Sequence, residues 1–344
     1  MAGPIGLAAT AGLLLAAGLA ADSRTGLLLG NTLLMAAGTV AASVPAGTLL
    51  GWLLMRTDLP GRRLGLLVLA VMLFVPLYLQ AAAWQAGFGL GGWATLAGAM
   101  PPWLDGWTGA IWVHGLAAIP WVALIVGVGF LLVEAELEEQ ALVEGPPARV
   151  FFHVSLPGAW PAVGVATVWV ALTAAGEMTV TDLFMIRTYA EELYTRRAAM
   201  GLGPLEALRG MVWQLLALAW LAAAGLALWV KLVPGERPLS LAHRPLVRLG
   251  RWRPLAAVSV HGALVLLAGL PLGSLVYKAG VVVIEAGGGW LRSWSVAKCL
   301  AMVVASPWEH AREFGWSVLI SAAAATTAAA GGAVLAWAAR GGRW

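Results

Sequence analysis

The 344-residue chain is 60% hydrophobic and 11% charged, and it carries a net charge of +4. Water-soluble chains have about a quarter charged residues, so this composition excludes an ordinary soluble domain and indicates a membrane protein. The single cysteine, Cys299, excludes an internal disulfide and a cysteine-based metal cluster. The sequence has no soluble face rich in Lys and Arg, so it does not predict binding to nucleic acid.

Apolar runs recur along the chain, and most are near the roughly 20 residues that a membrane-spanning helix needs. The eight predicted spans are Met1–Ala21, Leu27–Met55, Leu64–Trp84, Ala110–Val133, Trp160–Ala175, Leu205–Val230, Leu255–Tyr277 and Trp316–Ala339. The predicted fold class is therefore all-α, a polytopic transmembrane helix bundle of about eight spans.

Several local features refine these spans. The first run also resembles a signal peptide, but no Lys or Arg precedes it, which favours a transmembrane helix. Pro76 lies inside the third span, and Pro120 is expected to kink the fourth. Residues 87–109 and 278–313, which contain many Gly and Trp residues, are predicted as loops.

The basic residues indicate an orientation. Dense clusters adjoin helix ends at Arg56–Arg63, in the connector Lys231–Arg253 and at the C-terminus, all on one side of the predicted bundle. Because Lys and Arg are enriched in cytoplasmic loops, this side is predicted to be cytoplasmic. Tryptophans near the helix ends are typical of an interfacial aromatic belt.

A polar segment, Glu134–Pro157, interrupts the apolar pattern between the fourth and fifth spans. Its first half carries five glutamates: Glu134, Glu136, Glu138, Glu139 and Glu144. A Gly-Pro-Pro break at Gly145 separates it from a second half with an apolar face: Val150, Phe151, Phe152, Val154 and Leu156. A solvated loop does not need such a face, so the pattern predicts a helix pair that docks a partner.

A second polar group follows the fifth span and includes Glu177, Thr181, Asp182 and Arg187. Ionisable residues near membrane depth are costly and tend to face a bundle interior or a water-filled path. Two interpretations remain: these residues line a translocation path, or they form a solvated external loop after a shorter fifth helix.

The chain has no P-loop for ATP, and its five histidines are scattered without metal-ligand spacing. No Ser/His/Asp set or paired carboxylates stand out. The sequence therefore predicts neither an enzyme nor a metal site.

The polar segment resembles the EAA loop of ABC-importer permeases. That pattern is Glu-Ala-Ala, three residues, Gly, about nine residues and Ile-x-Leu-Pro. Here Glu139-Gln140-Ala141 is followed by three residues, Gly145, eight residues and Val154-Ser155-Leu156-Pro157. Gln140 replaces the first Ala, and the second segment is one residue short.

The resemblance extends to Gly30–Leu33 and to Arg56–Arg62, which are similar to the opening of ferric-iron and thiamine-type permeases, where two six-helix modules are fused. It implies an importer-permease (MetI-like) fold. Its expected parts are an N-terminal transmembrane helix (1–26), a first module (27–231) with the EAA loop at 134–157, a cytoplasmic connector (232–254) and the start of a second, incomplete module (255–344). The chain is interpreted as a truncated or split member, or alternatively as a single-module subunit with two extra helices.

The resemblance also implies partners and sites. A separate ABC ATPase binds ATP and Mg²⁺, so no cofactor is expected in this chain, and an external substrate-binding protein, a second permease module and membrane lipid complete the assembly in the bacterial cytoplasmic (inner) membrane. The implied ATPase-docking residues are Glu138, Glu139, Ala141, Gly145, Arg149, Leu156 and Pro157. Their glutamates are expected to face basic residues of the ATPase, and Gly145 to permit a turn with positive φ. The residues expected along the path are Glu177, Thr181, Asp182 and Arg187.

Ferric iron is the predicted substrate, with thiamine, a phosphonate, or another small anion or polyamine as alternatives. A different class, an ion-coupled secondary transporter, would use Glu177 and Asp182 as coupling carboxylates. A membrane enzyme or assembly factor is the third possibility.

Overall fold

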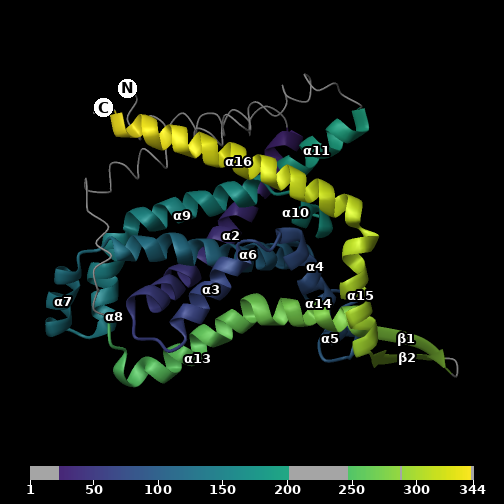
Figure 1. Ribbon diagram of the computed structural model, residues 1–344, viewed down its shortest axis with the longest axis horizontal. Helices are drawn as coiled ribbons and strands as arrows, with labels where there is room; N and C mark the ends of the chain where they lie inside the picture. The colour runs from purple at the N-terminus through teal and green to yellow at the C-terminus, as the bar shows by residue number, and fades with distance from the viewer. Residues whose placement is uncertain (1–22, 201–246, 287–288, 342–344) are drawn as a thin grey trace. The chain divides into compact units, whose positions relative to one another are not determined.

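The computed structural model describes residues 23–200, 247–286 and 289–341, which are mostly helical (Figure 1). These residues form two compact units, one ending at Ser274 and the other beginning at Leu275. The boundary between the two units lies inside helix α14 (Leu270–Gly280). The interpretation of the parts as permease modules stays a prediction.

Three long helices form the core of the first unit: α2 (Ser23–Arg56), α6 (Gly106–Leu131) and α9 (Leu156–Gly176). Each packs against the other two, and α2 and α6 approach most closely because glycines lie between them. A Cβ added at Gly51 would lie 2.5 Å from the backbone oxygen of Ala123. Small residues that allow backbones to approach are a common basis of helix packing in membranes.

Among the described residues, five helical segments are long and apolar enough to cross a membrane: Gly26–Arg56, Gly106–Leu131, Pro147–Gly176, Gly250–Gly280 and Ala311–Val334. They overlap the predicted second, fourth, fifth, seventh and eighth spans, and they indicate a multi-pass membrane protein. The predicted first and sixth spans lie outside the described residues, so the count of eight stays a prediction. Helix α6 continues through Pro120.

The predicted third span is broken. Helix α3 (Arg62–Met72) and α4 (Leu77–Phe88) are separated by four residues, and the apolar pair bends by 105° at that break. Pro76 explains the break, because proline cannot donate a helical hydrogen bond and disfavours the helical conformation in the residue before it. Pro76 occupies the N-cap position of α4.

The predicted loop at 87–109 contains a short helix, α5 (Trp93–Leu96), and packs against the rings of the flanking helices. The ring of Trp103 meets that of Trp112 in α6 edge to face at 5.1 Å, and Trp112 meets Trp84 of α4 in the same way at 5.5 Å. Trp84 is buried, so for this residue packing replaces the expected interfacial exposure.

Around this core, the first unit also contains α7 (Ala135–Glu144), α8 (Pro147–Val150), the π turn η1 (Phe151–Ser155), α10 (Thr179–Leu183) and α11 (Tyr189–Met200). After the undescribed residues come η2 (Gly250–Trp252), α13 (Arg253–Leu264) and the π turn η3 (Val265–Gly269), which continue into α14.

The second unit corrects the prediction that residues 278–313 form a loop. Part of this stretch is an antiparallel hairpin of β1 (Val281–Ala286) and β2 (Gly289–Trp294), in which Val281 pairs with Trp294. Four consecutive β-branched residues, Val281 to Ile284, favour the first strand, and the described residues as a whole are mostly helical, as an all-α bundle requires. Helices α15 (Val296–Glu309) and α16 (Ala311–Gly341) follow.

Candidate functional site

The glutamate-rich stretch 134–157, here called the docking segment, connects α6 to α9 at one end of the first unit. It consists of α7, α8, η1 and the first two residues of α9. Figure 1 shows α7 and α8 at the left, beyond the ends of α6 and α9. The segment is therefore placed where a partner outside the helix bundle can reach it.

One of its glutamates points inward. Glu138 forms an ion pair with Arg56, the last residue of α2, and each side chain is only 2% exposed. The hydroxyl of Ser155, at the end of η1, donates a 2.6 Å hydrogen bond to Glu138 Oε1. We call Arg56, Glu138 and Ser155 the buried ionic cluster.

This cluster corrects the role predicted for Glu138. The carboxylate was expected to face basic residues of a partner, but its charge is used inside the molecule. The reason is the phase of α7, which turns Glu138 inward together with Ala135 and Leu142, the neighbours at helical spacing. Burying a carboxylate is strongly unfavourable unless it is paired, and Arg56 provides the partner.

The outward face of the docking segment is acidic and apolar. Glu136, Glu139 and Glu144 are exposed, as are Val143, at 88%, and Leu137. The other predicted docking residues divide between exposed positions (Glu139, Arg149, Pro157) and half-buried ones (Ala141, Gly145, Leu156).

Gly145 ends α7, but not for the predicted reason. Its φ is −160°, an extended conformation open to any residue, so the expected positive φ is wrong. Its amide donates to the oxygen of Ala141 at 3.0 Å, and a Cβ at this position would lie 3.2 Å from Cδ of Arg149. A side chain at this position would therefore require a small shift of the exposed Arg149 side chain. Pro147 then begins α8, where its fixed φ suits the first helical position.

The second half of the docking segment is helical, as predicted, but it is not a separate helix. The π turn η1 joins α8 to α9, so that one helical segment runs from Pro147 to Gly176. Phe151 is buried, and its ring lies 4.8 Å from that of Trp52 and 6.1 Å from that of Phe130. The neighbouring Phe152 is 61% exposed.

The turn after Arg56 also holds the end of the connector. The amide of Val247 donates to the oxygen of Arg56 at 2.8 Å, and the amide of Leu249 donates to Asp58 Oδ1 at 3.0 Å. The sequence predicts a basic cluster at Arg56–Arg63 and a similarity to permeases at Arg56–Arg62, but it does not identify Arg56 and Ser155 as members of the site. The available signal was an arginine adjoining an apolar span, where an ionisable residue needs a partner.

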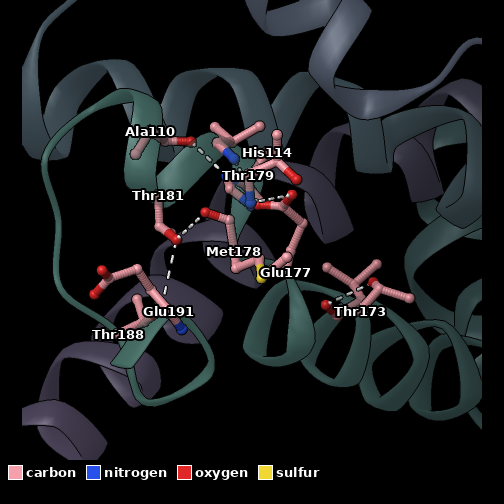
Figure 2. Close-up of polar contacts among 11 residues, drawn as sticks. Ala110, His114, Thr173, Glu177, Met178, Thr179, Thr181, Thr188 and Glu191 are labelled. Carbon is pink, nitrogen blue, oxygen red and sulfur yellow. Dashed lines mark hydrogen bonds and ion pairs between the residues drawn. The ribbon is translucent and has the colours of Figure 1, made fainter. Parts of the chain in front are cut away.

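The second polar group lies at the other end of α6 and α9 (Figure 2). Glu177 follows α9 and accepts hydrogen bonds from the amides of Thr179, at 2.8 Å, and Val180, at 3.0 Å. His114 of α6, which the sequence did not single out, places its Nε2 3.4 Å from Glu177 Oε2. Its Nδ1 lies 2.9 Å from the oxygen of Ala110 and is therefore the donor there, since a carbonyl only accepts.

These contacts favour the ionised form of Glu177. Burial raises the pKa of this carboxyl, but the contact with His114 and the two amide donors outweigh burial and hold its pKa below the ordinary value of 4.5. The carboxylate is therefore charged at neutral pH and stabilises the first turn of α10.

The predicted path residues do not form one cluster. Thr181 is buried, donates to the oxygen of Met178 at 3.0 Å and lies 3.5 Å from the hydroxyl of Thr188 (Figure 2). Asp182 and Arg187 have exposed side chains. The arrangement thus pairs Glu177 with His114 and leaves Asp182 and Arg187 on the surface of the described part of the chain.

The segment after α10 is fastened to the first half of α2. Asn31 Nδ2 donates to the oxygen of Arg187 at 2.8 Å, and Thr32 Oγ1 accepts from the amide of Tyr189 at 3.0 Å. Arg24 and Glu192 form an ion pair at 2.6 Å. Within the described ranges no three His, Cys, Asp or Glu side chains gather in a way that would hold a metal ion.

No model of a known protein family matches this chain, and no curated protein matches it.

Proposed function

We propose that the chain is the membrane-spanning permease subunit of an ATP-driven importer and that the docking segment receives the ATPase. The observation that carries the proposal is the division of α7 into two faces. One face is fastened to the bundle through Glu138, and the other presents glutamates and apolar side chains to the outside. The similarity of residues 139–157 to an EAA loop supports the same assignment.

In this proposal Glu139, Glu136 and Glu144 attract basic residues of the ATPase, while Val143 and Leu137 supply apolar contact. Complementary charge guides association, and buried apolar anchors provide most of the affinity. The ATPase holds ATP and Mg²⁺, an external binding protein delivers the substrate, and a second permease module completes the path in a bacterial cytoplasmic membrane.

Co-purification tests the docking step. The full chain is co-expressed with each ABC ATPase subunit of its source organism and isolated in detergent. We expect one subunit to co-purify, and we expect Glu139→Lys and Gly145→Asp to abolish that association. Glu309→Lys, an equal charge reversal at an exposed position outside the segment, is the matched control. Retained ATPase binding in both docking variants, or no binding by the unaltered chain, contradicts the proposal.

Ferric iron is the proposed substrate, on the resemblance alone, and competition of its uptake by thiamine or a phosphonate tests the alternatives. The second candidate function, ion-coupled transport, is favoured by one observation: a buried histidine faces the carboxylate of Glu177. Uptake into vesicles that follows a pH gradient without ATP would support that function over the first.

A further inference from the structure

We propose that the buried ionic cluster makes the docking segment, α2 and α9 move as one body, with Glu138 as a positioning residue. The transmission of ATPase movement by this cluster rests on the proposed function above. The mechanical connection itself does not, because it follows from the contacts within the first unit.

The cluster joins three segments that are distant in sequence. Arg56 ends α2, Glu138 lies in the middle of α7, and Ser155 ends the π turn that leads into α9. One carboxylate serves both neighbours: Oε2 faces Arg56, and Oε1 accepts from Ser155. Displacing α7 alone therefore breaks contacts to two helices at once.

Burial makes such a displacement unfavourable. Arg56 and Glu138 are both shielded from water, so a shift that separates them leaves the carboxylate of Glu138 buried without its cation. An exposed ion pair would separate easily, because water replaces the lost partner. The state in which α7 moves without α2 is therefore poorly populated.

The hydrogen bond from Ser155 lies where the chain would otherwise bend. A π turn interrupts the regular hydrogen bonds of a helix and is a frequent site of kinks. Here the bond to Glu138 holds the end of η1, and Phe151 packs against Trp52 of α2 at its start. The turn is thus held at both ends, and movement of α7 reaches α9 instead of being lost in bending.

The connection extends to the segment before α13. The oxygen of Arg56 accepts from the amide of Val247, and the amide of Asp58 donates to the oxygen of Val247 at 3.2 Å. The residue that pairs with Glu138 therefore also anchors the connector.

The adjacent residues Glu138 and Glu139 therefore have different roles. Glu139 is exposed and belongs to the proposed ATPase contact, whereas Glu138 is buried and sets the position of α7. This gives a matched pair of substitutions, Glu138→Gln and Glu139→Gln, that differ by one position and in the face of α7 that they change.

Spin labels test the mechanical connection without any partner. They are placed at Val143→Cys and Leu49→Cys, both exposed, in a Cys299→Ser background of the full chain in lipid nanodiscs. We expect the distances between the two labels to be narrowly distributed. Glu138→Gln is expected to broaden this distribution, and Glu139→Gln to leave it unchanged. The combined exchange Arg56→Glu and Glu138→Arg is expected to narrow it again. An unchanged width in Glu138→Gln overturns the proposal.

A milder variant covers the case in which Glu138→Gln does not fold. Ser155→Ala keeps the ion pair and removes only the bond at the end of the π turn. It is expected to broaden the same distribution, and an unchanged width in this variant also overturns the proposal.

Transport measurements separate this proposal from the proposed function. With a co-purifying ATPase in vesicles, Glu138→Gln is expected to retain ATPase binding but to lower substrate uptake per ATP about tenfold, a typical size for coupling between sites. Glu139→Gln is expected to weaken ATPase binding instead. If no ATPase binds the unaltered chain, the proposed function fails while the spin-label result still stands; unchanged uptake per ATP in Glu138→Gln overturns the transmission role.

Discussion

Two carboxylates at opposite ends of α6 and α9 are each paired with a cationic or ionisable nitrogen group. At the docking end, Glu138 and Arg56 are both 2% exposed. At the other end, Glu177 is 17% exposed and faces His114, which is 3% exposed. The two pairs differ in the partner and in the access of water to the carboxylate.

The docking end is held by a permanent ion pair, because arginine remains charged at every physiological pH. At the other end, burial raises the pKa of Glu177, but the contact with His114 and two backbone amides outweigh burial and lower that pKa below its ordinary value. This pair is conditional, because Glu177 loses its charge as the pH falls through the lowered pKa.

The largest expected effect comes from removing one member of the permanent pair. Arg56→Leu leaves Glu138 buried without its cation, and the loss of one partner from a buried pair costs about 3–5 kcal/mol. The combined variant Arg56→Leu and Glu138→Leu removes both charges and is expected to recover most of that loss, since apolar pairs often replace buried ion pairs without penalty. The free energy of unfolding in mixed detergent micelles measures both.

Equal destabilisation in the single and combined variants would contradict this prediction, because it would mean that side-chain shape, not uncompensated charge, determines the cost. Replacement of Glu309, which is exposed in the second unit, by Leu serves as the control for simple loss of a carboxylate.

A second effect concerns the packing under the docking segment. Phe151→Ala removes a buried ring that meets Trp52 and Phe130, and it is expected to cost about 3 kcal/mol because a cavity remains. The neighbouring Phe152→Ala, at an exposed position, is expected to cost far less. The same unfolding measurement compares them, and equal losses would show that Phe151 does not support the docking end.

The long helices could be predicted from sequence because their signal is local: an apolar run of sufficient length identifies each span wherever its neighbours lie. The break before α4 was harder, because Pro76 inside an apolar run is compatible with either a kinked or a divided helix. The hairpin at Val281–Trp294 was missed because glycines and tryptophans around its strands suggested a loop.

The helices of residues 134–157 could be predicted from the pattern, but which of their side chains are buried could not. Glu138 and Glu139 are chemically identical, and only the phase of α7 places one of them inward. The partner of the inward residue, Arg56, is remote in sequence, so the pairing depends on tertiary packing. For the same reason His114, an isolated histidine in an apolar helix, gave no indication that it would face Glu177.

The smallest effect tests the conditional end. Glu177→Gln removes the charge but keeps an oxygen that accepts from α10, so its cost near pH 7 is expected to be about 1 kcal/mol, as for a helix cap.

The pKa of Glu177 is lowered in the folded state. Its charge therefore stabilises the fold above the ordinary pKa of 4.5, and this contribution is lost as the pH falls through the lower pKa of the folded state. The difference between the unaltered chain and Glu177→Gln should therefore shrink toward zero as the pH falls below the lowered pKa. Unfolding measured at neutral pH and at successively lower pH checks this, with Glu309→Gln as the control for an exposed carboxylate. A difference that persists unchanged at low pH would mean that the carboxylate acts through shape alone, and the contrast between a permanent and a conditional pair would then lose its basis.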